Sequence, residues 1–394
     1  MLYFPQAHPI LPPAAWRRFA KFALGYGLLP FLLNPLWGQD VGNDKNPPAR
    51  SQEVSLSTPL AWLQEQDDYP LVSRRLMVLE PGCRQPRILL QPLLYCFDAA
   101  DHQAVRWAGN RLLVNGPQAE SRPSPNIAMP VQWVDLQSGR VGRLPGYPTG
   151  FEATQQGDRW LAWQLTSFTV RPLDSADSKP LLAWTETQLQ RSQIKSAHWS
   201  WDEKNVLVHV RVVRNGLRGG LWQVPFQGSA KHLGVLPGSI LQVLPSGLLL
   251  VAQRTSPKTY SPRRLLRLRA QEEKADVELL ANDLSWQETA GFRPQKQQVA
   301  FVRYSDGSLV LREIRQESDP IDRLLWKSEK RVTELAWSPD GRWLAFTDVD
   351  GSHQHWLRLI ELPTLKVHTL GFGKRPAFAA ETGKINRRVK DTDG

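Results

Sequence analysis

A chain of 394 residues can form one large all-β domain or two to three ordinary domains. Its composition, 41% hydrophobic and 22% charged, is typical of a globular protein, and its two cysteines exclude a disulfide-rich scaffold. The formal net charge of +11 favours anionic surfaces in general and does not single out nucleic acid. Sixteen tryptophans, with 31 prolines and 27 glycines, favour many short strands joined by frequent turns.

The first 38 residues have the pattern of an export signal. Arg17, Arg18 and Lys21 precede an apolar run over 22–37, which prolines interrupt and which is shorter than the about 20 residues of a comfortable membrane span. We expect 1–38 to be a cleaved signal peptide, with a retained membrane anchor or a buried apolar segment as alternatives. Cleavage removes three positive charges, so the exported form carries 11 − 3 = +8. The predicted location is periplasmic or otherwise exported.

A phrase near the C-terminus, "LAWSPDGRWLAF" over 335–346, has counterparts along the chain. In each, an apolar strand ends in a large apolar residue, a polar turn follows, and a second apolar strand begins. Subtraction of the anchor positions gives separations of 41 to 48 residues. The anchors are Trp107, Phe151, Trp199, Leu244, Phe292, Trp337 and Phe378.

Turn residues divide each repeat into four strands. Pro339 and Gly341 suit the corners of a type I turn after the first strand. The pairs Asp306-Gly307 and Asp350-Gly351 predict a tight hairpin between the second and third strands. A fourth strand follows, such as "KVHTL" over 366–370. Four strands per repeat of this length are typical of a β-propeller blade.

The phrase "LAWSPDGRWLAFTDVDG" over 335–351 resembles the repeat of TolB-type propellers, the WD-repeat-like (PD40-like) family found in the periplasm. The repeat period covers most of 70–386. The resemblance implies a β-propeller whose loops and channel form a rigid surface for binding other proteins. It extends to the propeller portion alone, because no counterpart of the TolB N-terminal domain is expected here.

The two ends of the repeat region predict how the ring closes. The repeat at Phe378 is incomplete, and the hairpin predicted over 73–90 has no anchor phrase before it. Both fragments together make one blade, so we expect an all-β, seven-bladed propeller over 70–386, with six blades as the alternative. Residues 39–69 are expected to be a linker with a short helix from Thr58 to Gln66, and 387–394 a disordered basic tail.

Few residues carry a signal for chemistry. No G-x-S-x-G motif or phosphate-binding loop occurs, and the close pair His353 and His355 is better explained by a hairpin than by a metal site. Cys83 and Cys96 are candidates for a disulfide in an oxidising compartment, with two free thiols as the alternative. A basic strand could contact an anionic surface or simply be a solvated edge; its arginines are Arg263, Arg264, Arg267 and Arg269.

Two functions follow as expectations. The first is an exported, non-enzymatic scaffold that binds an envelope protein, as a monomer without cofactor, metal or nucleic acid, and with peripheral membrane contact through the basic strand. The alternative is an enzyme or small-ligand sensor at the mouth of the channel. That alternative requires scattered side chains to converge there, and its candidates are His198, Asp202, Asp306 and Asp348.

Overall fold

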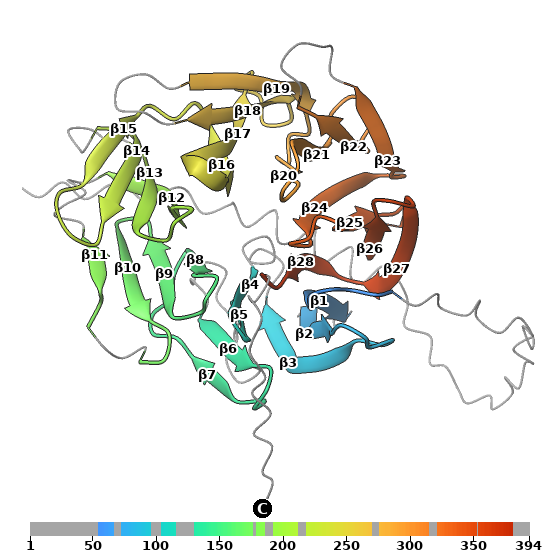
Figure 1. The fold of residues 1–394 in the computed structure, drawn as a ribbon, viewed down its shortest axis with the longest axis horizontal. Helices are drawn as coiled ribbons and strands as arrows, with labels where there is room; N and C mark the ends of the chain where they lie inside the picture. The colour runs from blue at the N-terminus through green and yellow to red at the C-terminus, as the bar shows by residue number, and fades with distance from the viewer. Residues whose placement is uncertain are drawn as a thin grey trace, which may run out of the picture. The chain divides into compact units, whose positions relative to one another are not determined.

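The computed structural model describes residues 54–66, 72–95, 104–115, 130–175, 179–185, 192–211, 218–269, 276–314, 321–352 and 354–380. They form seven four-stranded antiparallel sheets, arranged as blades around a central axis (Figure 1). The predicted all-β, seven-bladed propeller is therefore confirmed. In these ranges no helix has the length and apolar character to cross a membrane. The segments 1–38 and 387–394 lie outside them.

Within each blade the first strand lies nearest the axis and the fourth lies at the outer rim. Blade 1 comprises β4 (Val105–Ala108), β5 (Arg111–Asn115), β6 (Val131–Asp135) and β7 (Val141–Arg143). Blade 2 comprises β8 (Gly150–Ala153), β9 (Arg159–Gln164), β10 (Ser167–Pro172) and β11 (Leu182–Trp184). Blade 3 comprises β12 (Gln193–Trp199), β13 (Asn205–Arg211), β14 (Gly220–Pro225) and β15 (Lys231–Gly234).

The remaining blades repeat this order. Blade 4 comprises β16 (Ser239–Val243), β17 (Leu248–Arg254), β18 (Arg263–Arg269) and β19 (Asp276–Leu284), with a short 3-10 turn over Pro245–Gly247. Blade 5 comprises β20 (Ala290–Phe292), β21 (Gln298–Val302), β22 (Ser308–Glu313) and β23 (Asp322–Lys327). Blade 6 comprises β24 (Arg331–Trp337), β25 (Trp343–Val349), β26 (His355–Glu361) and β27 (Lys366–Phe372). Blade 7 comprises β28 (Lys374–Phe378), β1 (Leu60–Gln66), β2 (Val72–Leu79) and β3 (Arg87–Tyr95).

Blade 7 joins the two ends of the propeller. Strand β28 pairs with β1 in antiparallel fashion and places Leu60 opposite Phe378. Beside them the Ala379 N–H donates to the carbonyl of Pro59 at 3.0 Å. The predicted hairpin over 73–90 is formed by β2 and β3. Closure by the chain ends is confirmed, and it pairs strand edges that would otherwise stay open.

The short helix expected from Thr58 to Gln66 is wrong, because Leu60–Gln66 is strand β1. A threonine before a proline and an apolar run resembles a helix start, but β1 pairs with both β28 and β2. Its side chains alternate between the two neighbouring blades. Leu60 and Trp62 pack in the cluster with blade 6, whereas Ala61 and Leu63 pack with blade 1. The propeller thus starts at Leu60 and not at residue 70.

The second strands are apolar because each blade is covered on both faces by its neighbouring blades. All seven residues of β25 are buried, because blade 5 covers one face of the sheet and blade 7 covers the other. No polar face is left for the alternation that a half-exposed strand shows. Each boundary between blades therefore holds its own apolar cluster.

The same kind of turn follows the first strand in several blades. These turns lie on one face of the ring, here called the turn face. In blade 6 the Ser338 hydroxyl donates to Asp340 Oδ1 at 2.5 Å and accepts the Trp343 N–H at 2.9 Å. Thr154 and Ser200 make the same pair of bonds in blades 2 and 3. A hydroxyl that ties the turn to the next strand fixes the register of the hairpin.

Candidate functional site

The first strands of the seven blades lie nearest the central axis (Figure 1). These strands contain five Lys or Arg residues and two Glu residues, so their formal net charge is 5 − 2 = +3. The basic residues are Arg106, Lys195, Arg331, Lys374 and Arg375, and the acidic ones are Glu152 and Glu334. A channel of this balance attracts anions.

A carboxylate–histidine pair bridges blades 2 and 3 at the channel. Nδ1 of His198 lies 2.6 Å from Glu152 Oε1, and the Trp199 N–H donates to Glu152 Oε2 at 3.2 Å. Burial alone would raise the pKa of Glu152, but the contact with His198 and the nearby Arg106 charge outweigh it and lower that pKa. Nε2 of His198 is buried without a hydrogen-bond partner among the described residues. The nitrogen that a general base would present to a ligand is therefore shielded from the channel.

A polar pocket of about 190 Å³ opens on the channel between blades 5, 6, 7 and 1. Glu334 lies in its wall and accepts the backbone N–H of Arg375 at 2.6 Å and the Thr347 hydroxyl at 2.8 Å. The Arg375 Nε lies 3.1 Å from the other Glu334 oxygen. Glu288, also in the wall, lies 3.6 Å from Arg263 Nε. Both carboxylates of this pocket are thus matched by arginines.

Arg106 is the further charged residue of the pocket wall. Its side chain is exposed, and its Nη1 donates to the carbonyl of Val105 at 3.0 Å. Loss of bulk solvent around it lowers the pKa of Arg106, Glu152 opposes this shift, and the like charge of Arg375 adds to it. The guanidinium still carries its charge at neutral pH.

An apolar groove of about 330 Å³ lies on the turn face between blades 3 and 4. Trp201, in the turn after β12, is 50% exposed at this groove. The floor is formed by leucines from four strands: Leu207, Leu221, Leu233 and Leu249. Polar residues complete the lining: Ser200, Asp202, Asn205, Gln223 and Ser246.

The anchor of blade 4 differs from the aromatic anchors of other blades. Between blades 2 and 3, Arg159 lies over the ring of the anchor Trp199 and donates to the carbonyl of Glu203. Between blades 5 and 6, Arg293 lies over the anchor Trp337 in the same way. Blade 4 has Leu244 in place of an aromatic anchor, followed by the short turn Pro245–Gly247. Leu244 itself packs in the cluster between blades 4 and 5, and Ser246 and Gly247 of the turn line the groove.

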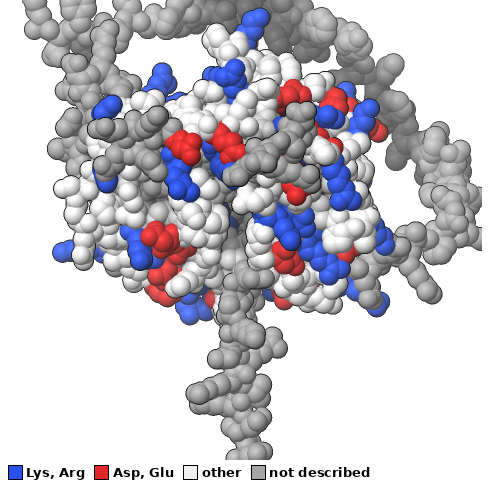
Figure 2. Space-filling model, turned by 45° about the horizontal axis from the view of Figure 1, so that its top comes forward, with Lys and Arg blue, Asp and Glu red and all other residues white. Residues whose placement is uncertain are grey.

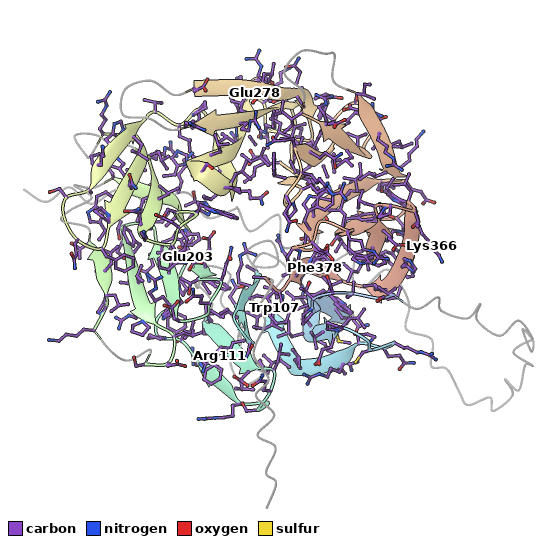
Figure 3. All side chains as sticks on the ribbon, in the orientation of Figure 1. Trp107, Arg111, Glu203, Glu278, Lys366 and Phe378 are labelled. Atoms are coloured by element: carbon purple, nitrogen blue, oxygen red, sulfur yellow. The ribbon has the colours of Figure 1, made fainter. Side chains whose placement is uncertain are left out.

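The four arginines predicted to contact an anionic surface do not form a single exposed basic patch. Strand β18 is the third strand of blade 4, and β19 forms the rim, where Figure 3 labels Glu278. Arg263 is 2% exposed, so the prediction of an exposed contact is wrong for it. Arg267 Nε lies 2.6 Å from Glu278 Oε2. Arg264 and Arg269 are exposed, and on the face shown in Figure 2 basic and acidic side chains are interspersed.

The structure describes one of the two cysteines predicted to form a disulfide. Cys83 is exposed in the turn between β2 and β3. Cys96 follows the end of β3 and lies outside the described residues. The disulfide between them stays a prediction.

The acidic side chains considered for a channel site belong to three different blades and serve their own hairpins. Asp202 accepts the Ser200 hydroxyl at 2.6 Å, Asp306 pairs with Arg303 at 2.8 Å, and Asp348 pairs with Arg358 at 2.8 Å. His353 lies outside the described residues. In the described ranges no group of three or more His, Cys, Asp or Glu side chains is placed to hold a metal ion.

His198 was among the candidates for the channel, but its partner Glu152 and the pocket residue Arg106 were missed at the sequence level, although a signal for them exists. Each first strand is short and apolar, so an ionisable residue inside it stands out: Arg106 before Trp107, Glu152 after Phe151, and His198 before Trp199. Because first strands line the axis of a propeller, such residues face the channel or its boundaries. The anchor positions point to these three, whereas Glu334 and Arg375 lie three residues before their anchors.

Three comparisons with known proteins were made, and one of them, with solved structures, found matches. No protein-family model matches the sequence, and no curated protein matches it. Among solved structures, the chain is similar to TolB from Acinetobacter baumannii, with a TM-score of 0.48, 12% identity, and coverage of 83% of this chain and 68% of that chain.

Enzymes also occur among the similar structures. A prolyl endopeptidase matches with a TM-score of 0.50 and 11% identity, over 80% of this chain and 50% of that chain. The periplasmic gluconolactonase of Pseudomonas aeruginosa matches with a TM-score of 0.45 and 14% identity, over 82% of this chain and 99% of that chain. The match to the prolyl endopeptidase, at 11% identity, shows a shared fold alone.

Proposed function

We propose that this protein is an exported, non-enzymatic β-propeller that binds another protein of the cell envelope. The observation that carries the proposal is the groove between blades 3 and 4, where Trp201 stands half-exposed beside a floor of leucines. The partner is expected to insert an apolar side chain there and to cover the indole of Trp201.

The chemistry of the groove suits a protein partner. A large aromatic side chain gains binding free energy by burying its area without losing much conformational entropy, so tryptophans are frequent at the centres of interfaces. The polar residues around the leucines supply hydrogen bonds at the rim, as in most interfaces between soluble proteins. Asp202 is held by Ser200, so its carboxylate is already oriented before a partner binds.

Export is supported by the basic and apolar pattern of 1–38. A binding role in place of catalysis is supported by the arrangement of the ionisable residues. The three aspartates considered for the channel are engaged in separate blades, and the free nitrogen of His198 is buried. The alternative, a ligand site at the channel mouth, keeps one observation in its favour, the exposed Arg106.

The test begins with a photo-crosslinking amino acid at position 201 and, as a control, at Val277 on the outer rim, which is 48% exposed. We expect position 201 alone to capture one stoichiometric exported protein. With the purified pair, Trp201→Ala should weaken binding about 30-fold or more, as for a central interface tryptophan. Tyr260→Ala, which removes a 68% exposed aromatic from another loop, should leave the affinity unchanged.

Two results would contradict the proposal. One is crosslinking at 277 as strong as at 201, or binding that is insensitive to Trp201→Ala. The other is a protein that captures no partner and copurifies with a small molecule, which would support the channel-mouth alternative. Retention of the uncleaved N-terminal segment in the cytoplasm would separately overturn the part of the proposal that concerns export.

A further inference from the structure

We propose that the pocket at the channel mouth binds a carboxylate group, and that Arg106 is the residue that receives it. This inference concerns the channel and is independent of the groove at Trp201. It rests on the charges of the pocket, on the free donors of Arg106 and on the size of the cavity.

The charges of the pocket leave one guanidinium without a counterion. The wall holds Arg106 and Arg375 together with Glu288 and Glu334. Glu334 is engaged by Arg375, and Glu288 lies beside Arg263, which reaches it from β18. Three arginines therefore meet two glutamates, and Arg106 is the one left over.

The donors of Arg106 are available to a ligand. Among the described residues it has no carboxylate within ion-pair distance, and the hydrogen bond from its Nη1 goes to the carbonyl of its neighbour Val105. Glu152 is near enough to act on Arg106 electrostatically, but its own oxygens are taken by His198 and by the N–H of Trp199. A guanidinium presents five donors, so most of those of Arg106 remain for a planar acceptor.

Thr333, on β24, belongs to the same wall. Thr333 lines the pocket, and within the described part of the chain its buried hydroxyl has no hydrogen-bond partner. Its backbone carbonyl accepts the Thr289 hydroxyl at 3.0 Å, which fixes this segment of β24 against blade 5. Because this hydroxyl is buried, as Nε2 of His198 is, the exposed donors that the pocket presents to a ligand are those of Arg106.

The size and polarity of the pocket indicate the class of ligand. A cavity of about 190 Å³ corresponds to roughly six water volumes, enough for a carboxylate with a few attached carbon atoms. The fork of an arginine matches the two oxygens of a carboxylate. Glu288 and Glu334 in the wall repel a doubly charged phosphate more strongly than a singly charged carboxylate. A small monocarboxylate or the side chain of an aspartate or glutamate fits these conditions.

The experiment uses purified protein and NMR titration with 13C-labelled acetate at constant ionic strength, adjusted with sodium chloride. We expect saturable line broadening of acetate, with phosphate a weaker competitor. Arg106→Gln should weaken acetate binding about tenfold or more, because a charge-assisted bidentate contact is lost. Arg106→Lys should lie between the two, since it keeps the charge and loses the fork. Arg269→Gln, at an exposed arginine of β18, should bind as the unaltered protein does.

A pair of capped hexapeptides, identical except for a central glutamate or glutamine, distinguishes the two sources of the carboxylate. Binding of the glutamate peptide at least tenfold tighter than acetate, and lost in Arg106→Gln, assigns the site to a protein side chain. Acetate binding as tight as the peptide's assigns it to a small free acid. The proposal is overturned if neither probe saturates, or if Arg106→Gln binds both unchanged while its circular dichroism and melting temperature match those of the unaltered protein.

Discussion

The indole N–H of Trp107 donates to the backbone carbonyl of Ala377 at 2.8 Å, and 270 residues separate the two. Trp107 belongs to the first strand of blade 1, and Ala377 belongs to β28, the C-terminal strand of blade 7. Figure 3 shows Trp107 and Phe378 close to the axis, on neighbouring first strands. The same bond joins blades 5 and 6, from Trp337 to the carbonyl of Gly291 at 2.9 Å. Each anchor tryptophan of this pair thus holds its own blade to the preceding one.

Trp107→Phe keeps an aromatic ring and removes the N–H donor. We expect the free energy of unfolding to fall by about 1–2 kcal/mol, from the lost hydrogen bond and the smaller ring. Trp337→Phe removes the equivalent bond at a boundary within the chain and should cost a similar amount. Urea denaturation of both variants checks this. A loss for Trp337→Phe with none for Trp107→Phe would show that the closing bond contributes nothing to stability.

Removal of strand β28 should prevent ring closure. A chain that ends at Gly373 loses the partner of β1 and uncovers Leu60 and Ala61, which are fully buried. An open strand edge next to apolar side chains favours aggregation. A chain that ends at Ala380 keeps β28 and should melt at the temperature of the full chain. Size-exclusion chromatography and thermal unfolding distinguish the two, and equal monomer yields would refute the closure argument.

Gly157 allows the turns of blades 1 and 2 to touch. Its φ is +75°, and a Cβ at this position would lie 2.4 Å from the backbone carbonyl atoms of Ala108. Gly139 has a similar φ of +67°, with nothing within 4 Å of its Cβ position. Gly139→Ala should therefore cost about 1 kcal/mol through backbone strain alone, whereas Gly157→Ala should cost clearly more. Denaturation curves measure the difference, and equal losses would mean that the turns can separate freely.

Because the pKa of His209 is lowered in the folded protein, we expect the free energy of unfolding to fall at mildly acidic pH. Burial lowers the pKa of His209 to about 4, and the nearby Lys195 and His198 add to the shift. Because the unfolded chain binds this proton near pH 6.5 and the folded chain only near 4, stability is lost as the pH falls through that window, by at most about 1.4 kcal/mol per unit. His209→Gln should flatten the slope of unfolding free energy between pH 6.5 and 4.

Lys195→Gln provides the matched variant for this prediction. Lys195 is exposed, so its replacement should not disturb packing, but it removes a positive charge near His209. The pKa of His209 should rise toward its ordinary value, and the slope should become shallower than in the unaltered protein. An unchanged slope in both variants would assign the acid sensitivity to carboxylates such as Glu152.

Two wrong expectations have the same physical origin. The helix over 58–66 and the inclusion of Arg263 in a surface contact were both inferred from local pattern. Leu60–Gln66 forms a strand because β28, more than 300 positions away, pairs with it. Arg263 is buried because its strand lies between β17 and β19 and both faces of its blade meet neighbouring blades. Where both faces are covered, alternation of charge and apolarity does not define a solvent face.

The sequence alone determined the repeat, because a four-stranded blade needs turn residues at fixed intervals and one large apolar anchor per unit, and both are local. Seven blades and closure by the chain ends followed from counting these signals. The meeting of Arg106, Glu334 and Arg375 at one mouth of the channel, and the space beside Trp201, were decided by the tertiary structure. Their distances depend on how seven wedge-shaped sheets pack around an axis, and packing joins residues that no local pattern relates.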